Sequence, residues 1–397
     1  MTPTRTTGIV NVADAQRRAR RTLPRALFDY IEGGADDETT LAENERAFTD
    51  VALRPRMGVD VGEPGIATTV LGTPLELPVL LAPCGMVQLA HPDGAVGVAR
   101  AASAAGTIAV LSKIALCSPE EVARRSPGPN WFQVNSAGGR DEVKHLMARA
   151  ADAGFSGLVL TLDGPPPGNH ERDVRHGVVP PVRLTPRFAA RLATQIAASP
   201  RWLASMTVAA RRQSATIKDA TRVLSSPGLR TSARFTWSDI EWIRSEWAGS
   251  LLVKGVLTGA DAVAAREVGA DAVVVSNHGG RALDGAPSTL SVLPEIVDAV
   301  GTTTEVLIDG GIRRAGCVVK ALSLGARAVF IGRPWVYGLA AAGQPGVERI
   351  LEIFRAELVR TLKLMGCPDV SALNPDWLQP MRPLSGQFPA TAAGPVL

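Results

Sequence analysis

The segment Ser276–Gly285, SNHGGRALDG, holds the side chains of this chain that are best suited to chemistry. It follows the apolar run 272–275, which predicts a buried strand. His278 can take up a proton near neutral pH, and Arg281 can hold a planar carboxylate through two parallel hydrogen bonds. The intervening glycines allow a ligand to approach the backbone. A His and an Arg on one strand-end loop are more often surface residues, so the rest of the chain must decide.

Eight short apolar runs recur along the chain at intervals that suit alternating strands and helices. The predicted strands are 79–83, 107–112, 130–135, 157–163, 250–255, 271–278, 305–310 and 327–333. Segments suited to helices follow them, as at 95–105, 141–153, 260–268, 289–300 and 316–323. This pattern is typical of an α/β protein with a (β/α)8 TIM barrel, and a doubly wound sheet is the alternative.

Polar side chains follow nearly every predicted strand, which favours the barrel. A barrel brings the carboxyl ends of all its strands to one mouth, so these residues would share a site there. They are Cys84, Ser112, Gln133, Asn135, Thr161, Asp163, Lys254, Ser276, His278, Asp309 and Arg333.

Two segments lie outside the repeat, and we expect a single barrel domain over 1–397 that includes both. Residues 1–75 are expected to form an N-terminal helical cap, with one helix starting near Pro24 and ending at Gly33. Residues 172–234 form a long excursion after the fourth strand with twelve Lys or Arg and two Asp. It is a solvated loop, a lid over the barrel mouth, or a surface for anionic lipid or a partner.

Composition excludes several classes of protein. Hydrophobic residues make up 46% and charged residues 20% of the chain, so global disorder is excluded. A net charge of +4 over 397 residues does not indicate a nucleic-acid binder. The four cysteines lie far apart, and we expect reduced thiols in a cytoplasmic protein. Neither a secretion signal nor an apolar run long enough to span a membrane is visible.

Two loops carry the signature of a phosphate site. Residues 307–314, LIDGGIRR, follow the seventh strand, and residues 328–334, AVFIGRP, follow the eighth. Barrels often bind phosphate at these two loops through backbone N–H groups, and Arg313 and Arg333 add charge there. Gln133 and Thr161 suit the polar edge of an isoalloxazine ring. Lys254 would lie where a reduced flavin carries negative charge, although a structural ion pair in the barrel mouth is the alternative.

These residues together resemble the FMN-dependent α-hydroxy-acid oxidases and dehydrogenases, the family of glycolate oxidase, lactate oxidase, mandelate dehydrogenase and hydroxymandelate oxidase. The likeness runs from about Leu23 to Cys367 and fades in the excursion. The motifs that carry it are residues 28–35 (FDYIEGGA), 41–44 (LAEN), 82–83 (AP), 90–94 (AHPDG), 253–255 (VKG), 276–284, 309–311 (DGG) and 331–334 (IGRP).

The resemblance implies FMN as cofactor and a role for each matching residue. His278 would be the base that removes a proton as two electrons pass to flavin N5, and Asp163 would orient it. Arg281 and Tyr30 would bind the substrate carboxylate. The implied cofactor-binding residues are Ala82, Pro83, Ser112, Gln133, Thr161, Lys254, Ser276, Asp309, Gly310, Gly311, Arg313, Gly332 and Arg333. No metal is implied.

Two positions depart from the family's pattern. Asn135 stands where the family has a tyrosine beside the reacting hydroxyl. His170 stands, by ungapped counting, where the family has a second carboxylate-binding arginine, although a shift across the nearby prolines would bring Arg172 there instead. Imidazole lacks the guanidinium's two-pronged recognition, and an amide in place of a phenol opens space.

The implied function is therefore an FMN-dependent oxidation of a 2-hydroxy acid or a related C–OH or C–H centre. The alternative is oxidation, oxidative decarboxylation or deamination of an atypical substrate in specialised-metabolite biosynthesis, which Asn135 and His170 motivate. The implied partners are the small-molecule substrate, an acceptor that is oxygen, a quinone or a protein, and copies of the chain in a homotetramer.

Overall fold

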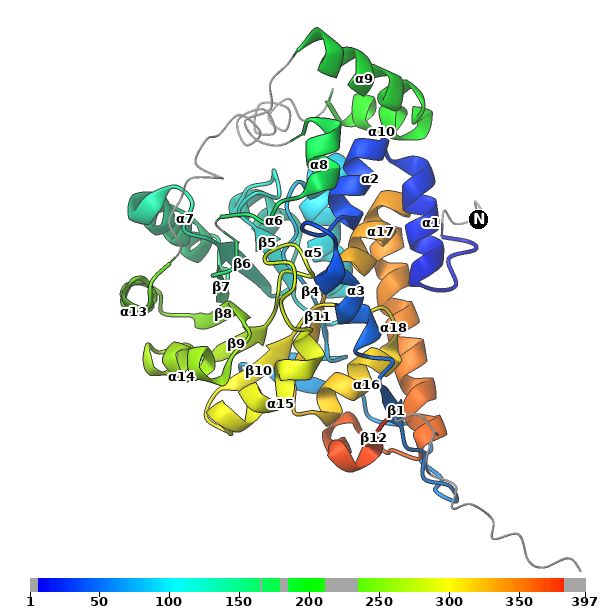
Figure 1. Ribbon diagram of the computed structural model, residues 1–397, viewed down its shortest axis with the longest axis vertical. Helices are drawn as coiled ribbons and strands as arrows, with labels where there is room; N and C mark the ends of the chain where they lie inside the picture. The colour runs from blue at the N-terminus through cyan, green and yellow to red at the C-terminus, as the bar shows by residue number, and fades with distance from the viewer. Residues whose placement is uncertain (1–5, 165, 179–184, 211–234, 382–397) are drawn as a thin grey trace, which may run out of the picture.

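Eight parallel strands close into a barrel in the computed structural model, which describes residues 6–164, 166–178, 185–210 and 235–381 (Figure 1). The strands are β4 (Val79–Leu81), β5 (Ala109–Ser112), β6 (Asn130–Val134), β7 (Gly157–Thr161), β8 (Ser250–Val256), β9 (Ala272–Val275), β10 (Glu305–Ile308) and β11 (Ala328–Ile331). They pair in chain order, and β11 returns to β4. The predicted (β/α)8 barrel is confirmed, and each strand lies within its predicted range or extends it by one residue.

The strands are apolar on both faces because the barrel interior and the outer helices bury them both. Side chains that point inward form one cluster, in which Trp131 packs edge to face against Phe330 with ring centroids 6.4 Å apart. Side chains that point outward join a second cluster with the surrounding helices. Layers of branched and aromatic residues therefore fill the barrel, which leaves its mouth as the place for a ligand.

Helices surround the barrel, and side-chain caps fix the start of α6, α13 and α14 among them. At α14, for example, the Thr258 hydroxyl accepts a hydrogen bond from the Asp261 N–H at 3.1 Å. The helices are α5 (Gly94–Ala104), α6 (Pro119–Arg125), α7 (Gly139–Asp152), α13 (Trp237–Glu246), α14 (Gly259–Glu267), α15 (Thr289–Val300), α16 (Ala315–Ser323), α17 (Arg333–Ala342) and α18 (Gln344–Met365).

The segment before the barrel contains helices and strands. The helices are α1 (Val12–Thr22), α2 (Arg25–Glu32) and α3 (Thr39–Arg46), and the strands are β1 (Val51–Leu53), β2 (Thr68–Val70) and β3 (Thr73–Leu75). The hairpin β2–β3 places Val70 and Leu75 in the interior cluster, so it closes the barrel end opposite the mouth. Strand β1 pairs antiparallel with β12 (Leu378–Pro380), which follows the short 3₁₀ helices η1 (Val370–Ala372) and η2 (Pro375–Trp377). A short helix, α4 (Val87–Ala90), follows β4.

The described part of the excursion is helical, with α8 (Glu171–His176), α9 (Pro186–Ala197) and α10 (Pro200–Ala210). Trp202 Nε1 donates to the Leu89 carbonyl at 2.8 Å, and Gln195 Oε1 accepts from the Ala26 N–H at 2.8 Å. These contacts tie α10 to α4 and α9 to α2, at the end of the molecule where Figure 1 shows α1 and α2. Residues 179–184 and 211–234, which include much of the basic stretch, lie outside the described residues. Among the described helices, none has the length and apolarity that a bilayer crossing requires.

Candidate active site

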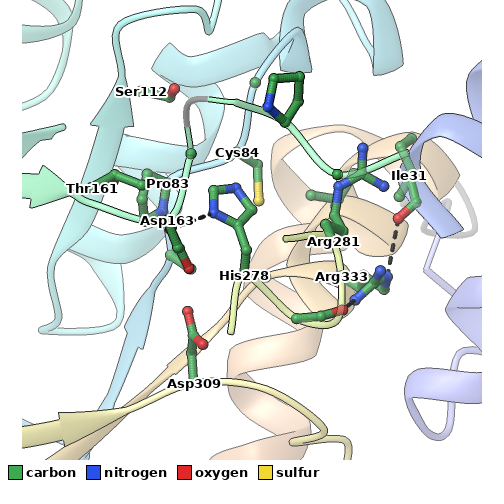
Figure 2. Close-up of a pocket in the computed structure, with 18 of the residues that line it drawn as sticks. Ile31, Pro83, Cys84, Ser112, Thr161, Asp163, His278, Arg281, Asp309 and Arg333 are labelled. Carbon is green, nitrogen blue, oxygen red and sulfur yellow. Dashed lines mark hydrogen bonds and ion pairs between the residues drawn. The ribbon is translucent and has the colours of Figure 1, made fainter. Parts of the chain in front are cut away.

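A cavity of about 750 Å³ opens at the carboxyl ends of the barrel strands (Figure 2). Its volume lies in the range usual for ligand sites, roughly 300–1,000 Å³. Every predicted site residue except Ser276 contributes to its wall. These are Tyr30, Ala82, Pro83, Ser112, Gln133, Asn135, Thr161, Asp163, His170, Lys254, His278, Arg281, Asp309, Gly310, Gly311, Arg313, Gly332 and Arg333.

His278 and Asp163 are in direct contact in the cavity, as Figure 2 shows. His278 Nδ1 lies 3.0 Å from Asp163 Oδ1. A carboxylate only accepts hydrogen bonds, so Nδ1 carries the proton and Nε2 is left to receive one. Burial alone would raise the pKa of Asp163, but the positive charges of His278 and Lys254 and the hydrogen bond from His278 lower it. The pair can therefore orient a base and stabilise its protonated form.

Lys254 is a buried cation between two carboxylates. Its Nζ lies 3.0 Å from Asp309 Oδ2 and donates to Ser276 Oγ at 2.7 Å. Burial alone would lower the pKa of Lys254, yet the charges of Asp309 and Asp163 raise it. A structural ion pair was the alternative role predicted for Lys254 from the sequence. The pair with Asp309 is such an ion pair, and the lysine also lines the cavity. Ser276 supports this arrangement from outside the cavity wall.

The β8 backbone makes room for this arrangement. The register between β8 and β9 shifts at Lys254/Val256, and Gly255 between them has a φ of 105°. A side chain at that position would meet Asp163 Cγ at 2.9 Å. Glycine therefore permits both the bulge and the approach of Asp163.

Three neutral polar side chains continue the cavity wall beside Lys254 in a hydrogen-bonded row. Ser112 Oγ donates to Gln133 Oε1 at 2.7 Å, and Gln133 Nε2 donates to Thr161 Oγ1 at 3.1 Å. They stand at the ends of the neighbouring strands β5, β6 and β7. Their fixed orientation suits the planar, polar edge of a flavin ring.

The end of the cavity near β10 and β11 is cationic. Arg333 donates to the backbone carbonyls of Ile31, Gly279 and Gly33 at 2.8–3.1 Å. Burial lowers the pKa of Arg333 to about 10, and the positive charges of Arg313 and Arg281 add to the fall. Arg313 pairs with Glu45 at 2.7 Å, whereas Arg333 has no carboxylate within 4 Å among the described residues, so an anionic phosphate would supply the missing counter-charge. The residues present thus fit an FMN phosphate.

Tyr30, from the N-terminal cap, lies beside Arg281 in the cavity wall. Arg281 Nη1 donates to the carbonyls of Tyr30 and Gly33 at 2.8 and 2.6 Å, and its guanidinium lies 5.0 Å from the centre of the Tyr30 ring. Burial raises the pKa of Tyr30 to about 12. Tyr30 therefore remains a neutral phenol that can donate to a carboxylate over the whole neutral range.

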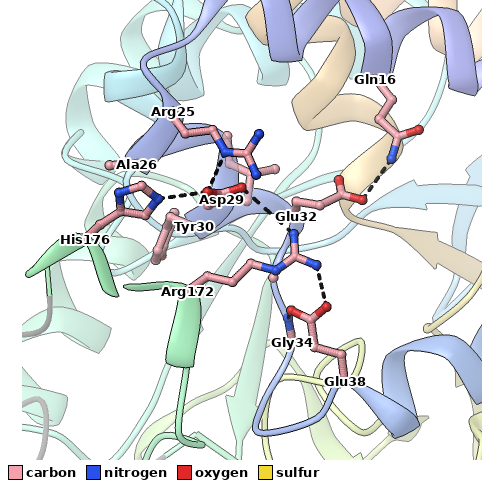
Figure 3. Close-up of polar contacts among 12 residues, drawn as sticks. Gln16, Arg25, Ala26, Asp29, Tyr30, Glu32, Gly34, Glu38, Arg172 and His176 are labelled. Atoms are coloured by element: carbon pink, nitrogen blue, oxygen red, sulfur yellow. Dashed lines mark hydrogen bonds and ion pairs between the residues drawn. The ribbon is translucent and has the colours of Figure 1, made fainter. Parts of the chain in front are cut away.

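The two departures from the family pattern both line the cavity. Asn135 accepts from the Ala137 N–H at 3.2 Å, and His170 Nε2 contacts the Arg281 carbonyl at 2.9 Å. Arg172 lies outside the cavity wall and forms an ion pair with Glu38, as Figure 3 shows (Figure 3). Of the two candidates for the second arginine position, His170 is the one that reaches the cavity.

Sequence reasoning missed part of the wall. Gly85, Met86 and Ile114 come from the loops after β4 and β5, and Asp173, Val174 and Val178 come from α8 or just after it. The strand-end pattern could have indicated the first group. It gives no signal for the second, because helix α8 lies inside the excursion.

Comparison with known proteins identifies the family to which the chain belongs. Residues 19–380 match the family model described as FMN-dependent dehydrogenase. Glycolate oxidase 5 of Oryza sativa subsp. japonica is 42% identical over 92% of this chain and 94% of its own. An L-lactate dehydrogenase of Caulobacter sp. is 41% identical over 90% and 95%. The solved structure of the monotopic membrane protein (S)-mandelate dehydrogenase superposes with a TM-score of 0.85 at 35% identity, over 94% of this chain and all of that one.

A second similar solved structure was determined with a ligand. It is a mandelate oxidase with an arginine-to-leucine substitution, determined with 2-hydroxy-phenylacetamide, at a TM-score of 0.77 and 35% identity. It covers 93% of this chain and 98% of its own.

Proposed function

The chain belongs to the FMN-dependent dehydrogenase family, and on this basis we propose the role of each residue in the site. It is an FMN-dependent oxidoreductase that oxidises a 2-hydroxy acid or a related C–OH centre. The observation that carries these proposed roles is the 3.0 Å contact between His278 and Asp163 at the cavity mouth, near the buried charge of Lys254. A base, its orienting carboxylate and a fixed cation are the groups that such an oxidation requires.

FMN supplies the acceptor for the two electrons that leave the substrate. We assign its phosphate to Arg313, Arg333 and the loops with Gly310, Gly311 and Gly332. The ring contacts are assigned to Ala82, Pro83, Ser112, Gln133, Thr161 and Lys254, with Ser276 behind the lysine and Asp309 towards the ribityl chain. The support for this is that these side chains, apart from Ser276, line one cavity.

We assign substrate binding to the end of the cavity that is lined by Arg281, Tyr30, Asn135 and His170. Arg281 and Tyr30 hold the carboxyl group of the substrate, so that the hydroxyl-bearing carbon lies beside His278. Nε2 of His278 takes the hydroxyl proton, and Asp163 stabilises the imidazolium through Nδ1–H. Helix α2 supplies Tyr30, and the carbonyls of Tyr30 and of Gly33 just after the helix orient Arg281.

Replacement of the base tests the proposal. His278→Ala is expected to retain FMN, since its side chain contacts Asp163 and not the phosphate end. Loss of general base catalysis lowers rates by roughly 10²–10⁴-fold. Anaerobic flavin reduction by lactate, mandelate and glycolate is the measurement. His145→Ala, at an exposed position on α7, is the control and should behave as wild type. Undiminished reduction in His278→Ala would remove this residue from the mechanism.

A second candidate rests on Asn135 and His170, which enlarge the site and reduce its charge relative to the family pattern. It is oxidation, oxidative decarboxylation or deamination of an atypical substrate in specialised biosynthesis. One similar structure, a mandelate oxidase with an arginine-to-leucine substitution, was solved with an uncharged ligand, 2-hydroxy-phenylacetamide. Rapid anaerobic bleaching of the flavin by simple 2-hydroxy acids, and none by their uncharged derivatives, would exclude it.

The cellular setting is also a proposal. We place the protein in the cytoplasm as a homotetramer that passes electrons to oxygen, a quinone or a protein. The four cysteines all lie among the described residues and form no disulfide there, which supports a reducing compartment. Reoxidation of the reduced flavin in air, compared with added quinone, distinguishes the acceptors, and light scattering gives the oligomeric state.

A further inference from the structure

Asn44 and Asn277 form a buried pair that joins the N-terminal cap to the loop of the proposed base. Asn44 lies on α3, Asn277 immediately precedes His278, and both are 1% exposed. Asn44 Nδ2 donates to Asn277 Oδ1 at 2.8 Å, and Asn277 Nδ2 donates back to Asn44 Oδ1 at 2.9 Å. The proposed mechanism gives neither residue a role, and neither is part of the cavity wall.

The surrounding backbone fixes the direction of both amides. Asn277 Oδ1 also accepts from the Gly280 N–H at 3.1 Å, and Asn277 Nδ2 also donates to the Pro287 carbonyl at 3.0 Å. Asn44 Oδ1 also accepts from the Thr289 N–H at 3.2 Å. Turning either amide over would set N–H groups against N–H groups and oxygen against oxygen. Paired buried networks of this kind are rigid and specify one arrangement of the groups that they join.

His278 and Gly279 lie inside a turn that Asn277 closes. Their φ angles are 59° and 63°, both in the left-handed region. The Gly280 N–H donates to the backbone carbonyl of Asn277 at 3.1 Å as well as to its side chain. Two consecutive residues with positive φ are what a type I′ turn requires, and Gly, Asn and Asp usually supply them. A histidine keeps such a backbone only where its surroundings enforce it.

The conformation of that turn directs the imidazole. It brings His278 Nδ1 within 3.0 Å of Asp163 Oδ1. Ser276 fixes the start of the turn, because its Oγ accepts from the His278 N–H at 3.1 Å. Asn277 fixes the turn itself. Among the described residues, Asn44 is the one partner of the Asn277 side chain that comes from outside the loop 276–288. Asn44 therefore anchors the turn to α3.

The residue assigned to the substrate carboxylate is held in a different way. Arg281 Nη1 donates to the carbonyls of Tyr30 and Gly33 at 2.8 and 2.6 Å, and neither bond involves the asparagine pair. Loss of the pair should therefore separate the rate of the chemical step from the binding of substrate.

We propose that Asn44 is a positioning residue for the oxidation, which acts through Asn277 to hold His278 in the conformation that reaches the substrate hydroxyl. The inference rests on the proposed function, in which His278 Nε2 takes the hydroxyl proton. A displacement of about 1 Å in a reacting group can cost roughly 10²-fold in rate. The cap thus contributes to the rate through α3 as well as through Tyr30.

The variants Asn44→Ala and Asn277→Ala, separately and together, test this on the FMN-loaded enzyme. The substrate is whichever of lactate, mandelate and glycolate reduces the wild-type flavin fastest under anaerobic conditions. At saturating substrate, reduction should slow by about tenfold or more in Asn44→Ala, with the substrate dissociation constant within about threefold of wild type. Because Asn44 acts through Asn277, the double variant should match Asn277→Ala within about threefold.

Two results would overturn the inference and leave the proposed function standing. One is an unchanged reduction rate in Asn44→Ala. The other is a double variant whose loss is the product of the two single losses, because independent damage multiplies in this way. Undiminished reduction in His278→Ala would instead overturn the proposed function and this inference with it.

FMN affinity separates positioning from damage to the cofactor site. A Cβ atom at Gly310 would lie 3.3 Å from the Asn44 amide, so the dissociation constant of FMN is measured by flavin fluorescence in each variant. It should remain close to the wild-type value, and a loss of FMN in proportion to the loss of rate would make Asn44 a structural residue. Glu43→Gln changes the same helix, where Glu43 pairs with Arg46 at an exposed position, and should behave as wild type.

A milder variant serves if the alanine variants do not fold. Asn44→Ser keeps a polar group near Thr289, but its side chain is too short to bind Asn277. It should show the same slower reduction with unchanged binding of substrate and FMN, and a wild-type rate in Asn44→Ser would overturn the inference.

Discussion

His278 has a backbone conformation that residues with a side chain rarely adopt. Its φ is 59°, in the left-handed region, and its N–H donates to Ser276 Oγ at 3.1 Å. Strained backbone of this kind persists where the surrounding structure enforces it and is concentrated at functional sites. Here it directs the imidazole from the end of β9 back towards Asp163. The same serine hydroxyl accepts from Lys254, so one buried group positions both the base and the cation.

Replacement of Lys254 is predicted to lower the free energy of unfolding. Lys254→Met leaves Asp309 and Asp163 without their buried partner, which costs about 3–5 kcal/mol of unfolding free energy. The pKa of Lys254 is raised in the folded state, so its contribution is complete below the ordinary lysine value of 10.5 and is lost as the pH rises through the higher folded value.

Urea unfolding of the wild type and the variant from pH 7 to 11.5 measures this effect. The two curves should differ most at neutral pH and converge at the alkaline end. Lys113→Met removes a lysine whose pKa is lowered by burial, and should show no such alkaline convergence. A pH-independent difference between Lys254→Met and wild type would contradict the assigned charge.

The residues at the strand ends could be predicted because the barrel rule needs only the strands and the positions that follow them. Asp173 could not be predicted in this way. It reaches the cavity from a helix whose place depends on contacts with distant residues, such as the 2.8 Å contact between His176 and Asp29. No local periodicity encodes such a contact.

At the scale of elements, that contact joins α8 to α2. Asp29 is buried, and its Oδ2 accepts from Arg25 at 2.6 Å and pairs with His176 at 2.8 Å (Figure 3). Burial alone would raise the pKa of Asp29, but Arg25 and His176 lower it below its ordinary 3.8. The tether is therefore intact above that value and is lost as the pH falls through the lower folded value.

Asp29→Asn is predicted to loosen α8 without stopping chemistry. The neutral amide loses both charge-assisted contacts, so amide exchange in residues 171–176 should rise and KM should increase several-fold, with kcat nearly unchanged. Hydrogen-exchange mass spectrometry and steady-state kinetics are the measurements. Asp14→Asn, which disturbs a capping box on α1, should leave exchange in α8 as it is. Equal protection of α8 in Asp29→Asn and wild type would contradict the tether.

The N-terminal cap and the loop 276–285 approach each other so closely that their backbones are in contact. Gly280 has a φ of 76°, and a side chain there would lie 2.5 Å from the Leu41 nitrogen at the start of α3. Nearby, Asn44 and Asn277 exchange side-chain hydrogen bonds of 2.8 and 2.9 Å. Helix α3 could not retain these contacts if residue 280 carried a Cβ atom.

Two alanine variants separate this clash from backbone strain. Gly280→Ala and Gly285→Ala both place alanine at positive φ, which costs about 1–2 kcal/mol, but Gly285 has open space around it. We expect Gly280→Ala to lose stability beyond Gly285→Ala and to release FMN more readily. Thermal unfolding and flavin fluorescence measure the two effects. Indistinguishable variants would mean that the cap adjusts without cost.

At the scale of the whole molecule, the packed barrel interior fixes the geometry of the mouth. Trp131 is 1% exposed and contacts Phe330 across the interior. Trp131→Ala is predicted to cost about 3–5 kcal/mol in unfolding free energy through the cavity it leaves. Trp242→Ala, at a partly exposed tryptophan beside Arg140, is the control and should cost far less. Urea unfolding compares them, and similar losses would contradict the role of the interior cluster.

The overall fold of the chain was partly predictable from its sequence. Eight apolar runs are individually weak signals, but their repetition defines the barrel. The hairpin β2–β3 and the pairing of β1 with β12 were not predicted. Each of these strands has only three residues, and the partners β1 and β12 lie more than 300 positions apart. Such pairings depend on the docked tertiary structure and not on local sequence.

The pairing of β1 with β12 has a consequence for biosynthesis. A ribosome releases Val51–Leu53 long before Leu378–Pro380 exist, so this early segment must wait for its partner while about three hundred further residues emerge. During that delay α2 also lacks Arg281 and Arg333, which later bind its carbonyls. Nascent chains stalled before residue 300 should therefore be protease-sensitive near their start and unable to retain the yellow chromophore.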